Sequence, residues 1–370
     1  MSKIRSYYNF AKLLSYNATI NAVNGGRGLG KTYGAKKKGT ADALKSCKFT
    51  EVVKTVTRRG KQKSETVIEA SAGYQFIYLR RYKEELSLAR ATFFADYEHE
   101  FPDWDFRLHG WEAQASPRKY AEMATGRPWA TIGYFVALSV AQNFKSVQFP
   151  RVKLIIFDEY IIEKGGQYLP NEASKFLNFY NTVDRYKDKT RVFMLANSVS
   201  ITNPYFIHYK IDPNKTDKNG FIKIADGYLL MHFPDSEQFQ AEVYQTKFGK
   251  FIADTDPDYA DYAVGNKFSD NNNNLLEIKG YKAKYLFTLE VKNGMFSVWY
   301  DFERNMYFCQ ENRPGNEDIR TIVPERMSEG KTFVTFNDKS LQMLRTAFRS
   351  DRVRFDRAPA RNAFVEIFKR

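Results

Sequence analysis

The stretch Gly25-Gly26-Arg27-Gly28-Leu29-Gly30-Lys31-Thr32 decides the fold of this chain. It matches the pattern GxxxxGK(S/T), whose glycines let consecutive backbone N–H groups point at phosphate oxygens. An apolar run of strand length, 20–24, precedes the motif, and a helical pattern follows it, as a phosphate-binding loop requires. The sequence therefore predicts a P-loop ATPase whose eight loop residues surround the phosphates of ATP. Lys31 would neutralise phosphate charge, and the Thr32 hydroxyl would bind Mg²⁺.

A second motif places two acids at the end of an apolar run. The run 154–157 is followed directly by Asp158 and Glu159. This is the pattern of a central parallel strand whose carboxyl end faces the phosphates. We expect Asp158 to hold Mg²⁺ through water and Glu159 to polarise the water that attacks the γ-phosphate.

Two further candidates for catalysis lie near a third apolar run, 192–196. Asn197 follows this run and is our candidate sensor of the γ-phosphate, although asparagine after a strand is more often a turn former. The basic segment 184–191 precedes the run, and in a ring such a segment can present an arginine to a neighbour's ATP. Arg185 is our choice for that role, with Lys187 and Arg191 in reserve. The alternative is a solvated loop charge.

The first half of the chain alternates between strand-length apolar runs and helical patterns, which is typical of an α/β fold with a mostly parallel sheet. Expected strands are 19–24, 75–79, 130–137, 154–157 and 192–196, and expected helices are 31–46, 84–100 and 172–184. Asn171 after Pro170 is a plausible N-cap for the last helix. We assign residues 1–205 to the ATPase domain.

Residues 48–72 interrupt this alternation with two β-branched runs joined by a basic tip, 58–63. This pattern indicates a projecting β-hairpin. Its tip is either a solvated turn or a contact with nucleic acid or another partner, and the sequence does not decide between them.

The pattern changes after Asn203-Pro204, and we interpret the charged, turn-rich residues 206–275 as a linker region. Residues 276–370 predict a second, α+β domain. Its expected strands are 285–291, 295–300 and 306–310, with Asn293-Gly294 as a hairpin turn, followed by a helix at 339–349.

The net charge of +14 over 370 residues favours a polyanionic partner such as nucleic acid. The last 40 residues hold ten Lys and Arg against four acids, so the C-terminal end has a large share of this charge. The two cysteines are far apart and the four histidines lack metal-binding spacing, which argues against a disulfide framework or a zinc site. The sequence contains no run of about 20 apolar residues and no signal-peptide pattern, so we expect no membrane association and no export.

Five segments together carry a resemblance to a known family. They are GGRGLGKT (25–32), FIYLRRYKEEL (76–86), LIIFDEYIIEKGGQYLPNE (154–172), NTVDRYKDKTRVFMLANSVSITNPYF (181–206) and RFDRAPARNAFVEIF (354–368). In order and spacing they resemble the double-stranded DNA packaging ATPases of small, short-tailed bacteriophages of the Picovirinae type. The resemblance implies a pentameric motor of the additional-strand, catalytic-glutamate class, which docks on the portal of an empty procapsid and drives DNA inward.

The resemblance also implies roles for individual residues and partners. It makes Arg185 a finger that acts in trans, and Lys83 and Lys145 contacts to DNA or to a neighbouring subunit. The implied partners are double-stranded DNA, copies of the same chain in a homopentameric ring, the procapsid portal protein and a structural packaging RNA, with ATP and Mg²⁺ at the site. Such a protein acts in the cytoplasm of the infected host, transiently at the portal vertex, and is absent from the mature virion.

The chain departs from the family in two respects. The hairpin at 48–72 is an insertion relative to the family's shorter connection, so its role is not inherited. The family's C-terminal domain resembles an RNase H-like nuclease without cleavage activity, and here Glu290, Asp301 and Glu303 do not make a convincing metal-binding set. Strand alternation would place some of these three on the solvent face.

Other functions remain open from the sequence. A cellular-type DNA translocase or helicase would share the same ATPase site without needing a procapsid. A nucleic-acid-binding scaffold that does not hydrolyse ATP is disfavoured by Glu159 beside Asp158. A small-molecule kinase would leave the basic charge unexplained.

Overall fold

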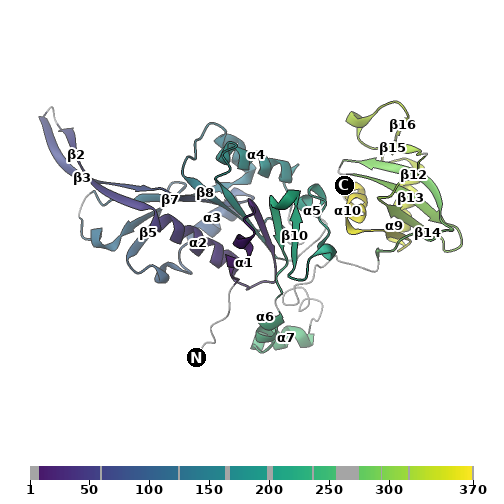
Figure 1. The fold of residues 1–370 in the computed structure, drawn as a ribbon, viewed down its shortest axis with the longest axis horizontal. Coiled ribbons are helices and arrows are strands. Elements are labelled where there is room, and N and C mark those ends of the chain that lie inside the picture. The colour runs from purple at the N-terminus through teal and green to yellow at the C-terminus, as the bar shows by residue number, and fades with distance from the viewer. Residues whose placement is uncertain are drawn as a thin grey trace. The chain divides into compact units, whose positions relative to one another are not determined.

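The computed structural model describes residues 8–58, 61–123, 126–162, 167–197, 203–235, 237–255, 275–292, 294–315 and 317–368. The chain divides into two compact units. The first comprises Met1–Val199 and Thr216–Lys267, and the second comprises Ser200–Lys215 and Phe268–Arg370. Figure 1 shows the elements of both.

The first unit is built on a nine-stranded sheet in the order β10-β11-β1-β9-β8-β4-β7-β6-β5. Strands β11, β1, β9, β8, β4 and β7 run parallel to one another, while β10, β6 and β5 pair antiparallel with their neighbours. The strands are β1 (Ile20–Asn24), β4 (Gln75–Arg80), β5 (Trp104–His109), β6 (Glu112–Pro117), β7 (Ala130–Ala137), β8 (Val152–Asp158), β9 (Arg191–Ala196), β10 (Phe221–Ile224) and β11 (Leu229–His232).

Strand β9 lies between β1 and β8 and pairs in parallel with both. An extra strand between the phosphate-loop strand and the acidic strand is the feature that gives the additional-strand class its name. The structure therefore agrees with the fold class that the family resemblance implies.

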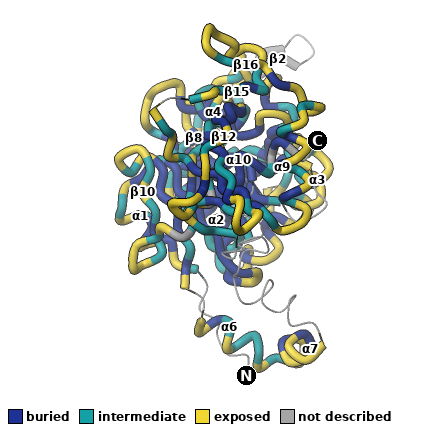
Figure 2. The backbone as a smooth tube through the Cα atoms, turned by 90° about the vertical axis from the view of Figure 1, so that its right-hand side faces the viewer, coloured by how far each residue is buried: buried dark blue, intermediate teal, exposed yellow. Residues whose placement is uncertain are grey.

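Helices cover both faces of this sheet. On one face, α2 brings Gly39 against the side chains of Leu154 and Ile156. Side chains on a strand alternate between the two faces, so Phe157 lies on the other face, where its ring stacks on Phe176 of α4. Strand β8 is consequently buried from both sides (Figure 2). The helices of this unit are α1 (Phe10–Ser15), α2 (Lys31–Lys45), α3 (Lys83–Ala91), α4 (Glu172–Asp184), α6 (Glu237–Tyr244) and α7 (Lys247–Thr255), with short 3-10 helices η1 (Glu98–Glu100), η2 (Arg118–Tyr120), η3 (Leu138–Phe144) and η5 (Ala225–Gly227).

Most predicted elements of this unit form within a few residues of their expected bounds, but two expectations were wrong and a third, the N-cap at Asn171, is confirmed only in position. The helix expected at 84–100 ends at Ala91. Asn171 occupies the N-cap position of α4, yet it has a left-handed backbone (φ 54°) and its side chain makes no capping hydrogen bond. The expected linker at 206–275 contains β10 and β11, and β11 extends the sheet beside β1. Residues 256–274 of that segment lie outside the described residues.

The hairpin predicted at 48–72 forms from β2 (Cys47–Arg58) and β3 (Lys61–Ala72), which pair antiparallel over their whole length. It makes a separate two-stranded sheet that extends away from the nine-stranded sheet (Figure 1). Its base is held by Phe49, whose ring contacts Trp104 and Tyr120. Residues 59 and 60 of its basic tip lie outside the described residues.

The second unit is an α+β domain with a six-stranded sheet in the order β16-β15-β12-β13-β14-β17. Strands β12, β13 and β14 are consecutive and antiparallel, and β15 and β16 join the other edge of β12 in parallel. This is the sheet arrangement of the predicted RNase H-like fold, with β17 added beside β14. Val291 pairs with Gly294, so Gly294 begins a strand, and Asn293 of the expected turn lies outside the described residues.

Helices α9 and α10 pack on the sheet through an apolar core that includes Leu344 and Phe364. The elements are β12 (Lys284–Val291), β13 (Gly294–Asp301), β14 (Met306–Gln310), β15 (Ile319–Thr321), β16 (Lys331–Phe333), β17 (Val353–Phe355), α5 (Pro204–His208), α9 (Lys339–Arg349), α10 (Ala358–Phe368), η4 (Pro213–Lys215) and η7 (Pro324–Arg326).

Candidate nucleotide-binding site

The loop between β1 and α2 has the backbone of a phosphate cradle. Gly28 and Gly30 have φ angles of 79° and 75°, a left-handed conformation that glycine adopts without a steric penalty. Helix α2 begins at Lys31, immediately after Gly30. A helix N-terminus presents unpaired N–H groups and the positive end of the helix dipole, so this junction favours an anion.

Lys31 is folded back onto its own loop. Its Nζ donates to the carbonyl oxygens of Gly25 and Gly26 at 2.8 Å each, and it lies 3.4 Å from Oδ1 of Asn197. Only 6% of the residue is exposed. Burial lowers the pKa of Lys31 from 10.5 to about 8, although the negative charge of Asp158 opposes the shift.

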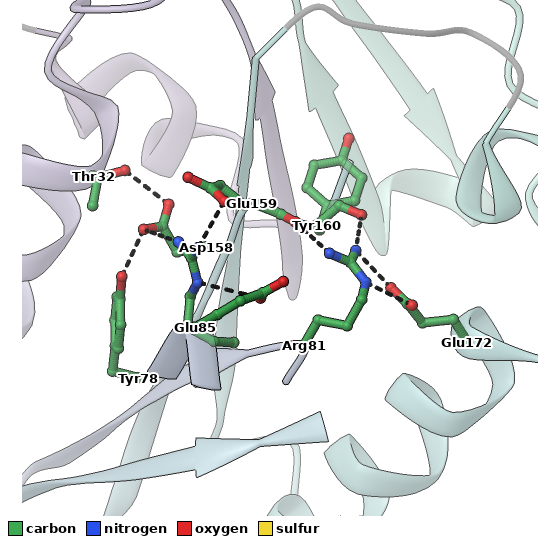
Figure 3. Close-up of polar contacts among 9 residues, drawn as sticks. Thr32, Tyr78, Arg81, Glu85, Asp158, Glu159, Tyr160 and Glu172 are labelled. Atoms are coloured by element: carbon green, nitrogen blue, oxygen red, sulfur yellow. Dashed lines mark hydrogen bonds and ion pairs between the residues drawn. The ribbon is translucent and has the colours of Figure 1, made fainter. Parts of the chain in front are cut away.

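Asp158, at the end of β8, accepts hydrogen bonds from three side chains. Its Oδ1 accepts from the Thr32 hydroxyl at 2.8 Å, and its Oδ2 accepts from the Tyr78 hydroxyl at 2.7 Å (Figure 3). Nη1 of Arg80 lies 3.3 Å from the same Oδ2. The phosphate loop and the acidic strand are therefore joined directly through Thr32 and Asp158.

Glu159 is held differently from its neighbour. It has a left-handed backbone (φ 56°), and its side chain is 57% exposed. Arg80 reaches it as well, because Nη2 donates to Glu159 Oε2 at 2.6 Å. One guanidinium thus contacts both carboxylates that follow the apolar run.

Behind these two acids lies a buried ion pair between Arg81 and Glu172, whose side chains are 1% and 0% exposed. Arg81 Nε and Nη2 donate to the two oxygens of Glu172 at 2.7 and 2.8 Å. The same guanidinium donates to the backbone carbonyls of Glu159 (3.1 Å) and Tyr160 (2.8 Å) (Figure 3). The Tyr160 hydroxyl in turn donates to Oδ1 of Asn24 at 2.6 Å. The backbone around Glu159 is therefore anchored on both sides.

These groups surround a cavity of about 280 Å³. It is lined by Arg27, Gly28, Leu29, Gly30, Lys31, Thr32, Tyr33, Asp158, Glu159, Leu195, Ala196 and Asn197. Most of the predicted loop lines the cavity, together with both acids and the predicted sensor. Gly25 and Gly26 are not among its lining, and their carbonyls hold Lys31 instead.

The remaining predicted residues lie elsewhere on the first unit. Arg185 is the exposed C-cap of α4, and its Nη2 donates to the carbonyl of Val147 at 3.3 Å. Lys83 is exposed at the first residue of α3, and Lys145 is exposed at the end of η3. Within the described part of the chain, none of these three lines the cavity.

Four residues of this site were missed in the sequence: Tyr78, Arg80, Arg81 and Glu172. A signal for the two arginines was present, because they follow the apolar run 75–79 as the two acids follow 154–157. Only the structure shows that β4 pairs with β8, which brings these two strand ends together. Lys83, the residue of this segment to which the resemblance assigns a role, lies three residues beyond Arg80.

The carboxylates considered in the second unit have other partners. Glu290 accepts from Lys331 Nζ at 2.9 Å, and Glu303 pairs with Lys282 at 2.6 Å. Asp301 Oδ1 accepts from the backbone N–H of Glu303 and of Arg304. Within the described residues, no group of three His, Cys, Asp or Glu is placed to hold a metal ion, and no helix is long and apolar enough to span a membrane.

The strand order, the glycine loop and the acidic pair define a P-loop ATPase fold of the additional-strand class. Comparison with known proteins identifies the family. The family model described as "Podovirus DNA encapsidation protein (Gp16)" matches residues 62–370. The DNA packaging protein of Bacillus phage phi29 is 31% identical over 368 residues, covering 98% of this chain and 97% of that protein. This chain therefore belongs to the Podovirus DNA encapsidation protein (Gp16) family.

Further relatives agree with this assignment. The DNA packaging protein of Bacillus phage B103 is 30% identical over 362 residues, covering 97% of this chain and 99% of that protein. A chain in the structure of the bacteriophage Phi-29 viral genome packaging motor assembly superposes with a TM-score of 0.70 at 30% identity, covering 99% of each chain. A chain of the Phi-28 gp11 DNA packaging motor shares the fold, with a TM-score of 0.61 at 20% identity and 98% of each chain covered.

The Arg81–Glu172 pair gives a test of stability. Replacing Arg81 by Met leaves Glu172 buried without its partner, and we expect the free energy of unfolding to fall by about 3–5 kcal/mol. The exposed Lys83→Met is the matched control, with an expected change within about 0.5 kcal/mol. Denaturant unfolding followed by tryptophan fluorescence measures both. Equal midpoints for the two variants would contradict a stabilising role for the pair.

The lowered pKa of Lys31 can be tested through the pH dependence of the unfolding free energy. Above about pH 8 the folded state releases this proton while the unfolded chain keeps it up to about pH 10.5. The unfolded state then binds more protons, so the unfolding free energy rises with pH. Between pH 8 and 10, we expect the unfolding free energy of the wild type to rise, relative to that of Lys31→Met, by on the order of 1 to 3 kcal/mol. A difference between the two proteins that does not vary with pH would show that burial leaves Lys31 unperturbed.

Proposed function

We propose that this chain is the ATPase of a viral DNA packaging motor, which uses ATP hydrolysis to translocate double-stranded DNA into a preformed procapsid. The observation that carries the proposal is the 2.8 Å hydrogen bond between Thr32 and Asp158, with Glu159 next in the chain and lining the same cavity. The family relatives are DNA packaging proteins, and a chain in the structure of a genome packaging motor assembly superposes on this chain.

The cavity suits the triphosphate of ATP. Its glycine loop and the N-terminus of α2 supply backbone N–H donors, and Lys31 supplies a buried positive charge. Nucleotide phosphates would replace the carbonyls of Gly25 and Gly26 as acceptors for Lys31 Nζ. Their charge would also favour the protonated lysine, which burial alone disfavours.

The oxygen atoms of Thr32 and Asp158 suit Mg²⁺, a cation that prefers oxygen ligands. Asp158 is buried and Thr32 is half-buried at the cavity, and their side chains are already within hydrogen-bond distance of each other. When bound, Mg²⁺ would neutralise charge that develops on the β- and γ-phosphates. Tyr78 and Arg80 hold the other oxygen of Asp158, which fixes the direction of the carboxylate.

Glu159 is the proposed group that orients the attacking water. It lines the cavity, and its side chain is more exposed than that of Asp158. The Arg80 guanidinium beside it donates to Oε2, and the second carboxylate oxygen, Oε1, can accept a hydrogen bond from water. Asn197 is the proposed sensor, because it lines the cavity and its Oδ1 lies 3.4 Å from Lys31 Nζ.

Arg185 is proposed to act in trans, in a homopentameric ring. Its position on the surface, away from the residues that line its own cavity, supports this role. A guanidinium supplied by a neighbouring subunit would stabilise charge on the transferred phosphoryl group. Lys83 and Lys145 are exposed and free to contact DNA or that neighbour.

The basic charge supports polyanionic partners. The net charge of +14 favours double-stranded DNA, and the basic C-terminal end favours contact with DNA, a structural packaging RNA or the procapsid portal protein. Such a motor would act in the infected host cytoplasm, transiently at the portal vertex.

Turnover of ATP tests the site. We expect ATPase activity that double-stranded DNA stimulates, and Lys31→Ala or Glu159→Gln to abolish it by removing phosphate binding or water activation. Glu98→Ala, at an exposed residue that does not line the cavity, is the control for the ATPase site. Robust phosphate release by either site variant would reject the assignment. Protection of DNA from nuclease, measured with and without procapsids, separates a packaging motor from a cellular-type translocase or helicase.

Mixed rings test the action of Arg185 in trans. Rings of Arg185→Ala subunits alone, or of Glu159→Gln subunits alone, contain no complete site. In a mixture, an Arg185→Ala subunit keeps Glu159 and receives Arg185 from a Glu159→Gln neighbour, so we expect ATPase activity to return. The absence of rescue at every mixing ratio would contradict action in trans.

A further inference from the structure

The loop that presents Arg185 is built around one buried carboxylate. Asp184, the last residue of α4, is 1% exposed. Its Oδ2 accepts from the backbone N–H groups of Lys187 and Asp188, and its Oδ1 accepts from those of Lys189 and Thr190, all at 2.9 Å. Four successive amides of the loop thus converge on a single side chain.

This arrangement requires a negative acceptor. An ionised carboxylate only accepts hydrogen bonds, so each of its two oxygens can take two N–H donors without conflict. Burial alone would raise the pKa of Asp184, but the four backbone hydrogen bonds lower it below its usual value. The carboxylate therefore stays ionised at neutral pH and holds all four amides.

The loop needs such an anchor because its backbone is strained. Arg185, Tyr186 and Asp188 all have positive φ angles, of 54°, 55° and 50°. This conformation costs free energy for residues other than glycine, and it persists only where contacts with the surrounding structure hold it in place. The hydrogen bonds to Asp184 follow immediately after Arg185 and Tyr186, so they fix the direction in which these two residues leave the helix.

The side chains at the strained positions point outward. Arg185 is exposed, and Tyr186 is 87% exposed. On the side toward β8, Lys189 Nζ donates to the carbonyl of Pro150 at 3.0 Å, which ties the loop to the rest of the unit. The loop is thus fixed from within while it presents an arginine and a tyrosine to an external partner.

We propose that Asp184 is a positioning residue for catalysis in the neighbouring subunit: it fixes the loop so that Arg185 reaches the ATP of a second copy of this chain. This inference rests on the proposed action of Arg185 in trans. In this proposal the loop is preformed in each subunit, and its shape depends on one carboxylate that does not line the nucleotide cavity.

The test uses Asp184→Asn in the full chain. Asparagine keeps the shape but replaces one acceptor oxygen by an NH₂ group, which then faces two N–H donors. A displacement of about 1 Å at a catalytic group can lower the rate about 100-fold, and we expect a loss of that order in DNA-stimulated ATPase activity, with nucleotide affinity unchanged. Asp188→Asn is the matched control: it makes the same change of charge in the same loop, at an exposed residue whose own left-handed conformation asparagine tolerates. It should retain wild-type activity.

Mixed rings then separate positioning from general damage. Asp184→Asn subunits should regain activity when mixed with Glu159→Gln subunits, because they keep Glu159 and receive a correctly held Arg185. Asp184→Asn subunits should regain no ATPase activity when mixed with Arg185→Ala subunits, because neither variant supplies a correctly placed Arg185. A subunit that is merely misfolded would fail in both mixtures, so that result would overturn the proposal, as would wild-type activity of Asp184→Asn alone.

The same mixtures distinguish the positioning role of Asp184 from the proposed action of Arg185 in trans. If Arg185→Ala and Glu159→Gln fail to rescue each other, action in trans is itself wrong. If they do rescue each other but Asp184→Asn and Glu159→Gln do not, only the positioning role is wrong.

Hydrogen exchange on the wild-type chain gives a check that needs no variant. The backbone amides that donate to Asp184 should exchange slowly; they are those of Lys187, Asp188, Lys189 and Thr190. Exchange at the rate of an unstructured peptide would overturn the proposal.

Discussion

The hydrogen bond from the Thr32 hydroxyl to Asp158 is the contact on which the site depends. It exists because β1, β9, β8 and β4 are parallel neighbours, so their carboxyl ends meet at one edge of the sheet. The glycine loop follows β1, Asn197 follows β9, the two acids lie at the end of β8, and Arg80 and Arg81 lie at the end of β4. Every polar group of the cavity is therefore placed by strand direction and strand order.

The parts of this site that the sequence predicted are those with local signals. The glycine pattern fixes a loop conformation, and an apolar run ending in Asp158 and Glu159 marks a buried strand with a polar end. The arginines after β4 had the same kind of signal, yet their partners depend on β4 lying next to β8, which no local pattern specifies. Strands β10 and β11 were missed because they are only four residues long and are flanked by charged, turn-rich sequence.

The acids of the second unit illustrate a different limit of sequence reasoning. Alternation along a strand predicts which side chains are buried, and the structure buries Glu290 and Asp301. Burial does not reveal what neutralises a carboxylate. Lys331 comes from β16, which is 41 residues from Glu290 in sequence, whereas Asp301 is held by N–H groups of its own turn. Both carboxylates are engaged in holding the fold.

The anchoring of Glu159 determines what kind of motion it can make. Its carbonyl is bound by Arg81, which Glu172 holds in turn, and the N–H of Tyr160 donates to the carbonyl of Leu195 at 3.2 Å. The peptide group is fixed on both sides, so only the χ torsions of Glu159 remain free to redirect its carboxylate. Rotamer changes of an exposed side chain take picoseconds to nanoseconds. The carboxylate can therefore change direction on that timescale while the backbone that carries it stays in place.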